Sequence, residues 1–250
     1  TFHNPTGITM SYKKRLELCN IPNLTIFSDE VYQLLYFDEP PPPSLSLMSE
    51  NVISLGSFSK ILAPSLRLGW IHTSDKYMKV LKECGIMDSS GGLNPITAAI
   101  VNKLMIEKHL DSNLLYLRQE LKECCDSLYD GLKKNLPENI EIKKPIGGYF
   151  IWFKLGININ KSDVKVHYGN KFSDNKEFND YVRLSFSYYT PEELILGAER
   201  LGICYNNNII VGIQGSRGKF GSLILKELQQ FYEIEIIEKD TENFNSQIII

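Results

Sequence analysis

The sequence predicts an α/β fold, because short apolar runs alternate with segments of helical periodicity along most of its 250 residues. Three apolar runs, at 24–27, 52–55 and 68–72, have the length of buried strands. Polar residues follow the first two runs, and open α/β sheets place their sites at the carboxyl ends of parallel strands. A glycine-rich turn beginning near residue 215 indicates a separate strand–turn–helix unit at the end of the chain.

The composition argues against several classes of partner. The net charge is -3 and 23% of residues are charged, which favours neither nucleic acid nor a membrane surface. No apolar run approaches the ~20 residues of a membrane span. The five cysteines are odd in number and lack C-x-x-C spacing, and the four histidines are scattered. We therefore expect no disulfide framework, no metal site, and a reducing compartment such as the cytoplasm.

The first candidate site residues lie at the ends of two predicted strands. The H-N-P-T-G motif at 3–7 predicts a turn, where Asn4 can place a side-chain amide. Asp29 follows the run 24–27, and Tyr32 comes three residues later, so both can face one pocket. A capping role for the Asp29 carboxylate is an equal alternative.

The loop after the run 52–55 carries a lone lysine, Lys60, next to the hydroxyls of Ser57 and Ser59. A lysine in a small, partly dry pocket loses proton affinity and becomes a nucleophile toward carbonyls, as a Schiff base requires. Arg67 follows seven residues later, and hydroxyls with a fixed guanidinium suit a phosphate-bearing aldehyde. The alternative is that Lys60 is a solvated loop lysine.

The chain between these sites and the glycine-rich turn predicts further regular elements. We expect helices at 11–18, 76–84, 95–108, 114–136 and 190–202, and strands at 140–143, 149–154 and 181–186. Arg183 lies among apolar residues of the last of these strands. A buried arginine needs an anion, so Arg183 pairs either with a hidden carboxylate or with a ligand carboxylate.

The C-terminal segment has the pattern of a dinucleotide-binding unit. It predicts a strand at 209–213, a turn with Gly215, Gly218 and Gly221, a helix at 222–231, and a strand at 233–237 followed by Glu238. The glycines would let the backbone approach a pyrophosphate, and the acid would bind ribose hydroxyls. Arg217 and Lys219 make NADP as suitable as NAD. The alternative is that the glycines only tighten the turn. The last apolar run, 248–250, is expected to lack a partner strand.

Five ordered motifs resemble those of class I aminotransferases, the fold-type-I pyridoxal-phosphate enzymes. They are H-N-P-T-G, S-D-E-V-Y, S-F-S-K with R-L-G-W, G-G-Y-F-I-W and V-R-L-S-F. The resemblance covers residues 1 to about 205. The run F-S-K-I-L-A-P-x-L-R-L-G-W is similar to that of the 2-aminoadipate and multi-substrate transaminases.

The resemblance implies a role for each candidate residue. Lys60 would carry pyridoxal phosphate as a Schiff base and return as the proton shuttle. Asp29 would pair with the pyridine nitrogen, and Arg183 would bind the substrate α-carboxylate. The ring hydroxyl would be contacted by Asn4 and Tyr32, and the phosphate by Ser57, Ser59 and Arg67.

The expected domains follow from the aminotransferase resemblance and from a second resemblance in the C-terminal segment. A partial pyridoxal-phosphate-binding large domain spans 1–110, and an α+β small domain spans 111–205. The start of a Rossmann-type domain spans 207–250 and is similar to the N-terminus of dihydrodipicolinate reductase. Another Rossmann dehydrogenase, such as prephenate dehydrogenase, is an alternative. We expect the chain to be a piece of a longer protein.

The expected function is transfer of an amino group between an L-amino acid and a 2-oxo acid, by a ping-pong mechanism in a homodimer. Amino acids such as 2-aminoadipate or those with aromatic or branched side chains are candidate substrates. One alternative is an NAD(P)-dependent reductase of lysine biosynthesis with an inactive transaminase region. Another is a pyridoxal-phosphate-fold DNA-binding regulator.

Overall fold

The computed structural model describes residues 1–90, 94–157, 164–175, 177–207, 211–212 and 248–249. The chain divides into two compact units. Unit 1 contains Thr1–Asp126, Lys143–Trp152 and Arg183–Tyr189, and unit 2 contains Ser127–Ile142, Phe153–Val182 and Thr190–Ile250. Each unit is built from helices and strands, as the α/β prediction requires.

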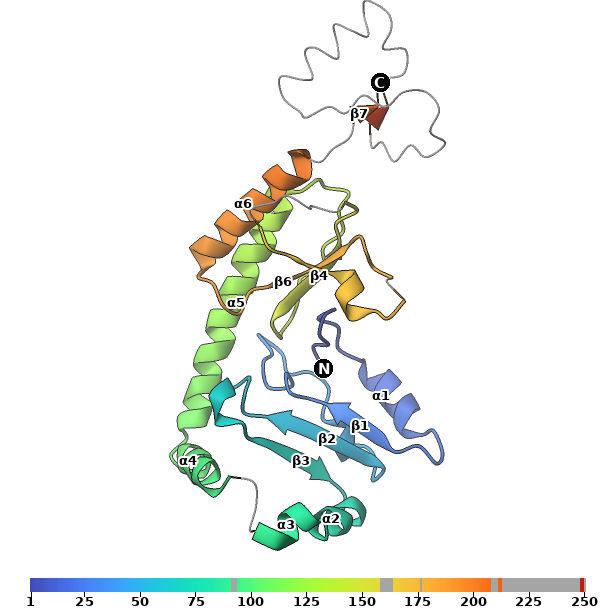
Figure 1. Ribbon diagram of the computed structural model, residues 1–250, viewed down its shortest axis with the longest axis vertical. Helices are drawn as coiled ribbons and strands as arrows, with labels where there is room; N and C mark the ends of the chain where they lie inside the picture. The colour runs from blue at the N-terminus through green and yellow to red at the C-terminus, as the bar shows by residue number, and fades with distance from the viewer. Residues whose placement is uncertain (91–93, 158–163, 176, 208–210, 213–247, 250) are drawn as a thin grey trace, which may run out of the picture. The chain divides into compact units, whose positions relative to one another are not determined.

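Unit 1 is organised around a three-stranded sheet in which β2 is central (Figure 1). Its strands are β1 (Ile26–Asp29), β2 (Val52–Ser57) and β3 (Gly69–Thr73). β1 and β2 are parallel, with Ile26 opposite Val52, whereas β2 and β3 are antiparallel. Ile26, Val52 and Leu45 form a buried apolar cluster that fixes this register. The three predicted strands are confirmed, with boundaries shifted by one or two residues.

The helices of unit 1 follow the caps and apolar positions in the sequence. They are α1 (Tyr12–Cys19), α2 (Asp75–Lys82), α3 (Gly85–Ser90), α4 (Pro95–Ile106) and the short helices η1 (Leu45–Leu47) and η2 (Pro64–Leu66). The Ser11 hydroxyl accepts a hydrogen bond from the Lys14 amide and caps α1, as predicted. α5 (His109–Asn135) begins in unit 1 and ends in unit 2. Its buried residues include Leu114, Leu121, Cys125, Leu128 and Leu132, which recur at helical spacing.

A buried arginine in α1 holds the polyproline stretch of unit 1. Arg15 is 2% exposed, and its Nη1 atom donates to the carbonyls of Pro42 and Pro43 at 3.2 and 2.7 Å. Its Nη2 atom donates to the Thr1 hydroxyl at 2.7 Å. Carbonyl oxygens and a hydroxyl therefore satisfy this guanidinium, and the stretch is fixed by it.

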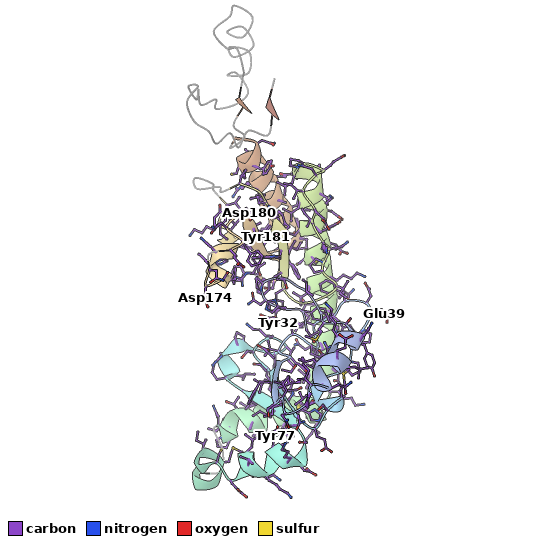
Figure 2. The ribbon with its side chains drawn as sticks, turned by 90° about the vertical axis from the view of Figure 1, so that its right-hand side faces the viewer. Tyr32, Glu39, Tyr77, Asp174, Asp180 and Tyr181 are labelled. Atoms are coloured by element: carbon purple, nitrogen blue, oxygen red, sulfur yellow. The ribbon has the colours of Figure 1, made fainter. Side chains whose placement is uncertain are left out.

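Unit 2 contains β5 and parts of β4 and β6, three strands that form a second sheet in the order β4-β6-β5. These strands are β4 (Phe150–Lys154), β5 (His167–Tyr168) and β6 (Tyr181–Ser185), and the division between the units passes through β4 and β6. Figure 2 labels Asp180 and Tyr181 at the start of β6, where Asp180 forms an ion pair of 2.9 Å with Lys154. The short helix η3 (Gly169–Phe172) and the helix α6 (Pro191–Asn207) complete the unit.

Two small residues allow α5 and α6 to approach closely within unit 2. A Cβ added at Gly131 would lie 2.9 Å from the Ala198 Cβ, and one at Gly202 would lie 2.5 Å from the Asn135 carbonyl oxygen. The predicted strand at 140–143 is wrong, because only Ile142 forms an isolated bridge, with Phe153. Pro145 follows closely and has no N–H with which to extend a ladder.

The C-terminal segment is described only at two short strands. β7 (Val211–Gly212) and β8 (Ile248–Ile249) pair in parallel, so the expectation that the last run has no partner is wrong. The rest of the predicted strand at 209–213 and everything from its turn to Glu238 lie outside the described residues. Among the helices that are described, none is both long and apolar enough to cross a membrane.

Candidate active site

The candidate site lies at the carboxyl ends of the two parallel strands β1 and β2. All of its described residues belong to unit 1. Asp29 is the last residue of β1 and Ser57 is the last residue of β2. Asp29 is exposed, and its Oδ1 atom accepts a hydrogen bond of 3.1 Å from the Val31 amide. The carboxylate thus makes the capping bond considered above and also faces the surface at this edge.

The loop after β2 holds Lys60 in a defined turn. The Ser57 hydroxyl accepts a hydrogen bond of 3.1 Å from the Ser59 amide, and the Phe58 amide donates to the Leu68 carbonyl at 3.1 Å. Phe58 is buried and anchors this turn to the interior. Lys60 is half-buried, so it is not the fully solvated lysine of the alternative interpretation.

Tyr32, labelled in Figure 2, is the centre of the cluster around Lys60. The ring of this buried residue lies 5.9 Å from the Lys60 Nζ atom and contacts the rings of Tyr149 and Phe150 edge-on, at 5.3 and 6.2 Å between centroids. Burial raises the pKa of the Tyr32 hydroxyl, while Arg183 lowers it and Asp29 raises it. Tyr32 therefore keeps its proton at neutral pH and can donate a hydrogen bond.

Arg183 and Asn4 are brought together from the two ends of the matched motifs. The Arg183 Nη1 atom donates to the Asn4 Oδ1 atom at 2.7 Å, and the guanidinium carbon lies 4.2 Å from the Phe150 ring centroid. Burial lowers the pKa of Arg183, and the nearby Tyr32 opposes this effect. Arg183 is half-buried and stacked, a geometry that suits recognition of a planar anion.

Arg67 lies at the end of η2 with its backbone in the left-handed region, at φ 50° and ψ 41°. Its exposed side chain donates to the Pro64 carbonyl at 3.3 Å. Among the described contacts, no hydrogen bond joins Arg67 to Ser57 or Ser59. Ser57 and Ser59 are thus hydrogen-bonded to each other at one end of the loop, and Arg67 lies at its other end without a described hydrogen bond to either.

Two further residues were given no role from the sequence. Glu30 is 8% exposed, and its Oε1 atom accepts hydrogen bonds from the hydroxyls of Ser28 and Ser54 and from the Leu45 amide, at 2.9, 3.1 and 3.0 Å. This carboxylate ties β1, β2 and η1 together beside Asp29. The sequence feature that could have drawn attention to Glu30 is its position between Asp29 and the apolar Val31. Tyr149 is the other residue, and the G-G-Y-F-I-W motif already contained it.

The donor set fits pyridoxal phosphate. Its aldehyde requires a lysine amine, and its pyridine nitrogen requires a carboxylate, which lies here at the neighbouring strand end. Its phosphate is suited to the two hydroxyls, and its ring hydroxyl to a tyrosine. The observation that carries this fit is the Lys60 amine lying 5.9 Å from the ring of the buried Tyr32, with Asp29 and Arg183 near enough to influence the pKa of the Tyr32 hydroxyl. Among the described residues, no group of three or more His, Cys, Asp or Glu side chains could hold a metal ion.

The proposed dinucleotide ligands, namely Gly215, Gly218, Gly221 and Glu238, lie outside the described residues. Their arrangement is therefore a prediction from the sequence alone.

Comparison with known proteins identifies similar chains. The family "Aminotransferase class I and II" matches residues 1–201. Aromatic-amino-acid aminotransferase 1 of Thermococcus litoralis is 33% identical over 217 residues, which cover 80% of this chain and 51% of that protein. The uncharacterized HTH-type transcriptional regulator YdfD of Bacillus subtilis is 30% identical over 216 residues, which cover 81% of this chain and 44% of that protein.

A solved structure shows the same fold. The kynurenine aminotransferase of Pyrococcus horikoshii, in complex with PMP, KYN as substrates and KYA as products, aligns with a TM-score of 0.72 and 27% identity. The alignment covers 82% of this chain and 54% of that one. The chain thus spans about half the length of these relatives.

Proposed function

Because the chain belongs to the class I and II aminotransferase family, we propose that it transfers an amino group between an L-amino acid and a 2-oxo acid with pyridoxal phosphate. The observation that carries this proposal is the Lys60 Nζ atom lying 5.9 Å from the ring centroid of the buried Tyr32. Asp29 at a strand end and Arg183, which stacks on the neighbouring Phe150, both influence the pKa of the Tyr32 hydroxyl. When bound, the cofactor supplies a protonated pyridine ring that accepts the electron pair of the substrate Cα.

The proposed roles divide between holding the cofactor, moving a proton and binding the substrate. Lys60 binds the cofactor covalently and afterwards moves the proton at its Nζ atom. Asp29 keeps the pyridine nitrogen protonated by pairing with it, and Asn4 and Tyr32 orient the ring through its hydroxyl. Ser57, Ser59 and Arg67 bind the phosphate.

Arg183 is the proposed ligand of the substrate α-carboxylate. Its guanidinium is held by Asn4 at 2.7 Å and rests on the Phe150 ring at 4.2 Å. A guanidinium fork of this kind can bind a carboxylate with two parallel hydrogen bonds. The candidate substrates remain amino acids with aromatic, branched or 2-aminoadipate side chains. A homodimer and a cytoplasmic location complete the proposal, together with a large domain at 1–110 and a small domain at 111–205.

The test is multiple turnover by the full chain supplied with pyridoxal phosphate. We expect the amino group of a panel of L-amino acids to appear on 2-oxoglutarate or another 2-oxo acid, and we expect Lys60→Ala to abolish this transfer. Absence of turnover by the wild type with every amino acid of the panel would contradict the proposal. Turnover by Lys60→Ala equal to that of the wild type would remove Lys60 from its role.

A regulator is the second candidate function, because a transcriptional regulator is 30% identical over 81% of the chain. A regulator of this kind would bind the cofactor and an amino acid without repeated release of product. The two candidates differ in one observable. Amino transfer beyond one equivalent per chain supports the enzyme, and a single equivalent supports the regulator.

For the C-terminal segment we retain the proposal of a dinucleotide-binding domain that begins at 207. It rests on the sequence pattern of Gly215, Gly218 and Gly221 with Glu238 23 residues after the first glycine. Isothermal titration of the chain with NADH and NADPH is the test. Gly218→Val should weaken binding at least ~10-fold, equal to about 1.4 kcal/mol. Absence of any heat of binding would leave the glycines as turn residues and exclude the reductase alternative.

A further inference from the structure

The carbonyl oxygen of Lys60 is bound by a side chain from a distant part of the sequence. The Tyr149 hydroxyl donates to it at 2.6 Å, across 89 residues. Tyr149 comes directly before β4, and both residues belong to unit 1. Lys60 lies in a turn after β2, outside the strand ladder, and the N–H of the same peptide group, the Ile61 amide, donates to the Phe58 carbonyl at 3.3 Å. The shorter Tyr149 hydrogen bond holds the carbonyl side of that peptide group, next to the residue that would carry the cofactor.

The next carbonyl along the turn is held in the same way. The Asn113 Nδ2 atom, from α5, donates to the Ile61 carbonyl oxygen at 2.7 Å. Ile61 itself is 1% exposed, so its buried side chain anchors the turn in the protein interior. The carbonyls of Lys60 and Ile61 are held by Tyr149 and Asn113. Two successive peptide groups are thereby held by side chains, and the first of them is bonded directly to the Lys60 Cα atom from which the side chain leaves.

The Tyr149 hydroxyl is suited to act as a permanent donor. Its ring packs edge-on against Tyr32 and Phe150, at 5.3 and 6.2 Å between centroids. Burial, followed by the influence of Tyr32, raises the pKa of Tyr149 to about 12. The hydroxyl therefore remains protonated at neutral pH, and the hydrogen bond to Lys60 persists. The same ring also supports Tyr32, whose ring lies below the Lys60 amine.

We propose that Tyr149 is a positioning residue for Lys60, and that its hydroxyl orients the Lys60 peptide so that the Nζ atom stays over the Tyr32 ring, ready to react with the cofactor aldehyde. This inference rests on the proposed function, because it assigns Lys60 as the residue that binds pyridoxal phosphate. Tyr149 acts through Lys60 and does not itself contact the reacting atoms. The proposal separates the hydroxyl, which holds the loop, from the ring, which packs the interior.

Tyr149→Phe removes only the hydroxyl and keeps the ring contacts. The matched control is Tyr77→Phe. Tyr77 lies on α2, and its hydroxyl forms a hydrogen bond of 2.9 Å with the Thr25 hydroxyl. Tyr77 and Tyr32 are well separated within unit 1 in Figure 2, so the control removes a hydrogen bond of similar length away from Lys60. Both variants are compared with the wild type as full chains.

Two measurements test the positioning role of Tyr149 separately from the proposed function. The first is hydrogen exchange of the amides at 58–63 in the cofactor-free protein. The second is the rate at which borohydride fixes added pyridoxal phosphate on Lys60, with thermal midpoints measured alongside. For Tyr149→Phe we expect exchange at 58–63 to be faster and fixation slower, each by roughly 2- to 12-fold, as loss of one hydrogen bond implies. Tyr77→Phe should leave both rates within twofold of the wild type.

Each outcome decides one of the two claims. Unchanged exchange and fixation in Tyr149→Phe would overturn the positioning role. Equal changes in Tyr149→Phe and Tyr77→Phe would overturn it as well, since the effect would then be general loss of stability. A wild type that fixes no cofactor on Lys60 would contradict the proposed function. The exchange measurement, made without cofactor, would then still decide whether the Tyr149 hydroxyl holds the loop.

Discussion

The Arg183 Nη1 atom donates a hydrogen bond of 2.7 Å to the Asn4 Oδ1 atom, across 179 residues of sequence. The amide fixes one edge of a guanidinium that also lies on the Phe150 ring. Because the fork of a guanidinium is planar and rigid, fixing one edge determines the direction in which it meets a carboxylate. With the roles proposed above, Asn4 would therefore act on the substrate side of the candidate site as well as on the cofactor ring.

Arg183→Lys should weaken substrate binding. An ammonium keeps the charge but cannot form two parallel hydrogen bonds with a carboxylate. Loss of one charge-assisted bond corresponds to about 1.5–3 kcal/mol, so we expect kcat/KM to fall by roughly 10- to 100-fold, mainly through KM. The measurement is steady-state kinetics with varied amino acid.

Arg118→Lys is the matched control for that change. Arg118 donates to the Leu34 carbonyl at 2.8 Å and stacks on Tyr36 at 3.7 Å from the ring centroid, and neither of these contacts involves a candidate ligand. We expect it to lower stability by about 1 kcal/mol and to leave KM unchanged. Equal kinetic losses in the two variants would remove Arg183 from the substrate site.

Arg67→Gly should separate stability from cofactor binding. The left-handed backbone of Arg67 is costly for a side chain, and glycine relieves that strain while increasing the entropy of the unfolded chain. The two effects oppose one another, so we expect the free energy of unfolding to change by less than about 1 kcal/mol. The affinity for pyridoxal phosphate should nevertheless fall by about 10-fold or more through loss of a phosphate contact. Denaturant unfolding and cofactor titration measure the two quantities, and an unaltered affinity would exclude Arg67 as a phosphate ligand.

Gly56→Ala should destabilise the loop that carries Lys60. A Cβ at Gly56 would overlap the Trp70 indole, which packs against Phe58 at 4.8 Å between ring centroids. The indole would have to rotate away and give up that contact, at a cost of about 1–3 kcal/mol. Gly197→Ala is the control, because no atom beyond the neighbouring backbone of α6 lies within 4 Å of the added methyl, and a helical alanine there should stabilise by about 0.5–1 kcal/mol. In denaturant unfolding, we expect the free energy of unfolding to fall for Gly56→Ala and to rise for Gly197→Ala. A change in the same direction for both variants would contradict the packing described for Gly56.

Stability should decrease at alkaline pH partly because of Tyr149. Its pKa rises from the ordinary 10.0 to about 12 on folding. Between these values the folded protein retains the proton and the unfolded chain loses it, so the free energy of unfolding decreases as the pH rises. This stabilising contribution is complete below pH 10.0 and is lost as the pH approaches about 12. Unfolding measured from pH 9 to pH 12 should show a shallower decrease for Tyr149→Phe than for the wild type, and parallel curves would contradict the assignment.

Local patterns in the sequence were sufficient for most helices and strands. The helices expected at 11–18 and 114–136 and the strand expected at 52–55 each depend on neighbours within a few residues, and the structure confirms them. The strand expected at 140–143 failed because pairing depends on a partner elsewhere in the chain, which is not visible in a local pattern.

The contacts that complete the candidate site are all long-range. The pairs Arg183–Asn4 and Tyr149–Lys60 join residues 179 and 89 positions apart, and no spacing rule connects them. The sequence could identify the residue types, because Asp29 follows one predicted strand, Lys60 lies in the loop after another and Arg183 lies among the apolar residues of a third. It could not identify Tyr149 as a partner of Lys60, since a tyrosine in an apolar motif is equally a packing residue.

The most direct test of the central claim is to identify the residue that binds the cofactor. The full chain is incubated with pyridoxal phosphate and reduced with borohydride, and its peptides are analysed by mass spectrometry, with Lys60→Ala treated in parallel. We expect one stoichiometric modification on the peptide that contains Lys60, removed by an L-amino acid added before reduction and absent from the variant. Modification spread over several surface lysines, or equal modification of Lys60→Ala, would contradict the assignment of Lys60 as the residue on which the chemistry depends.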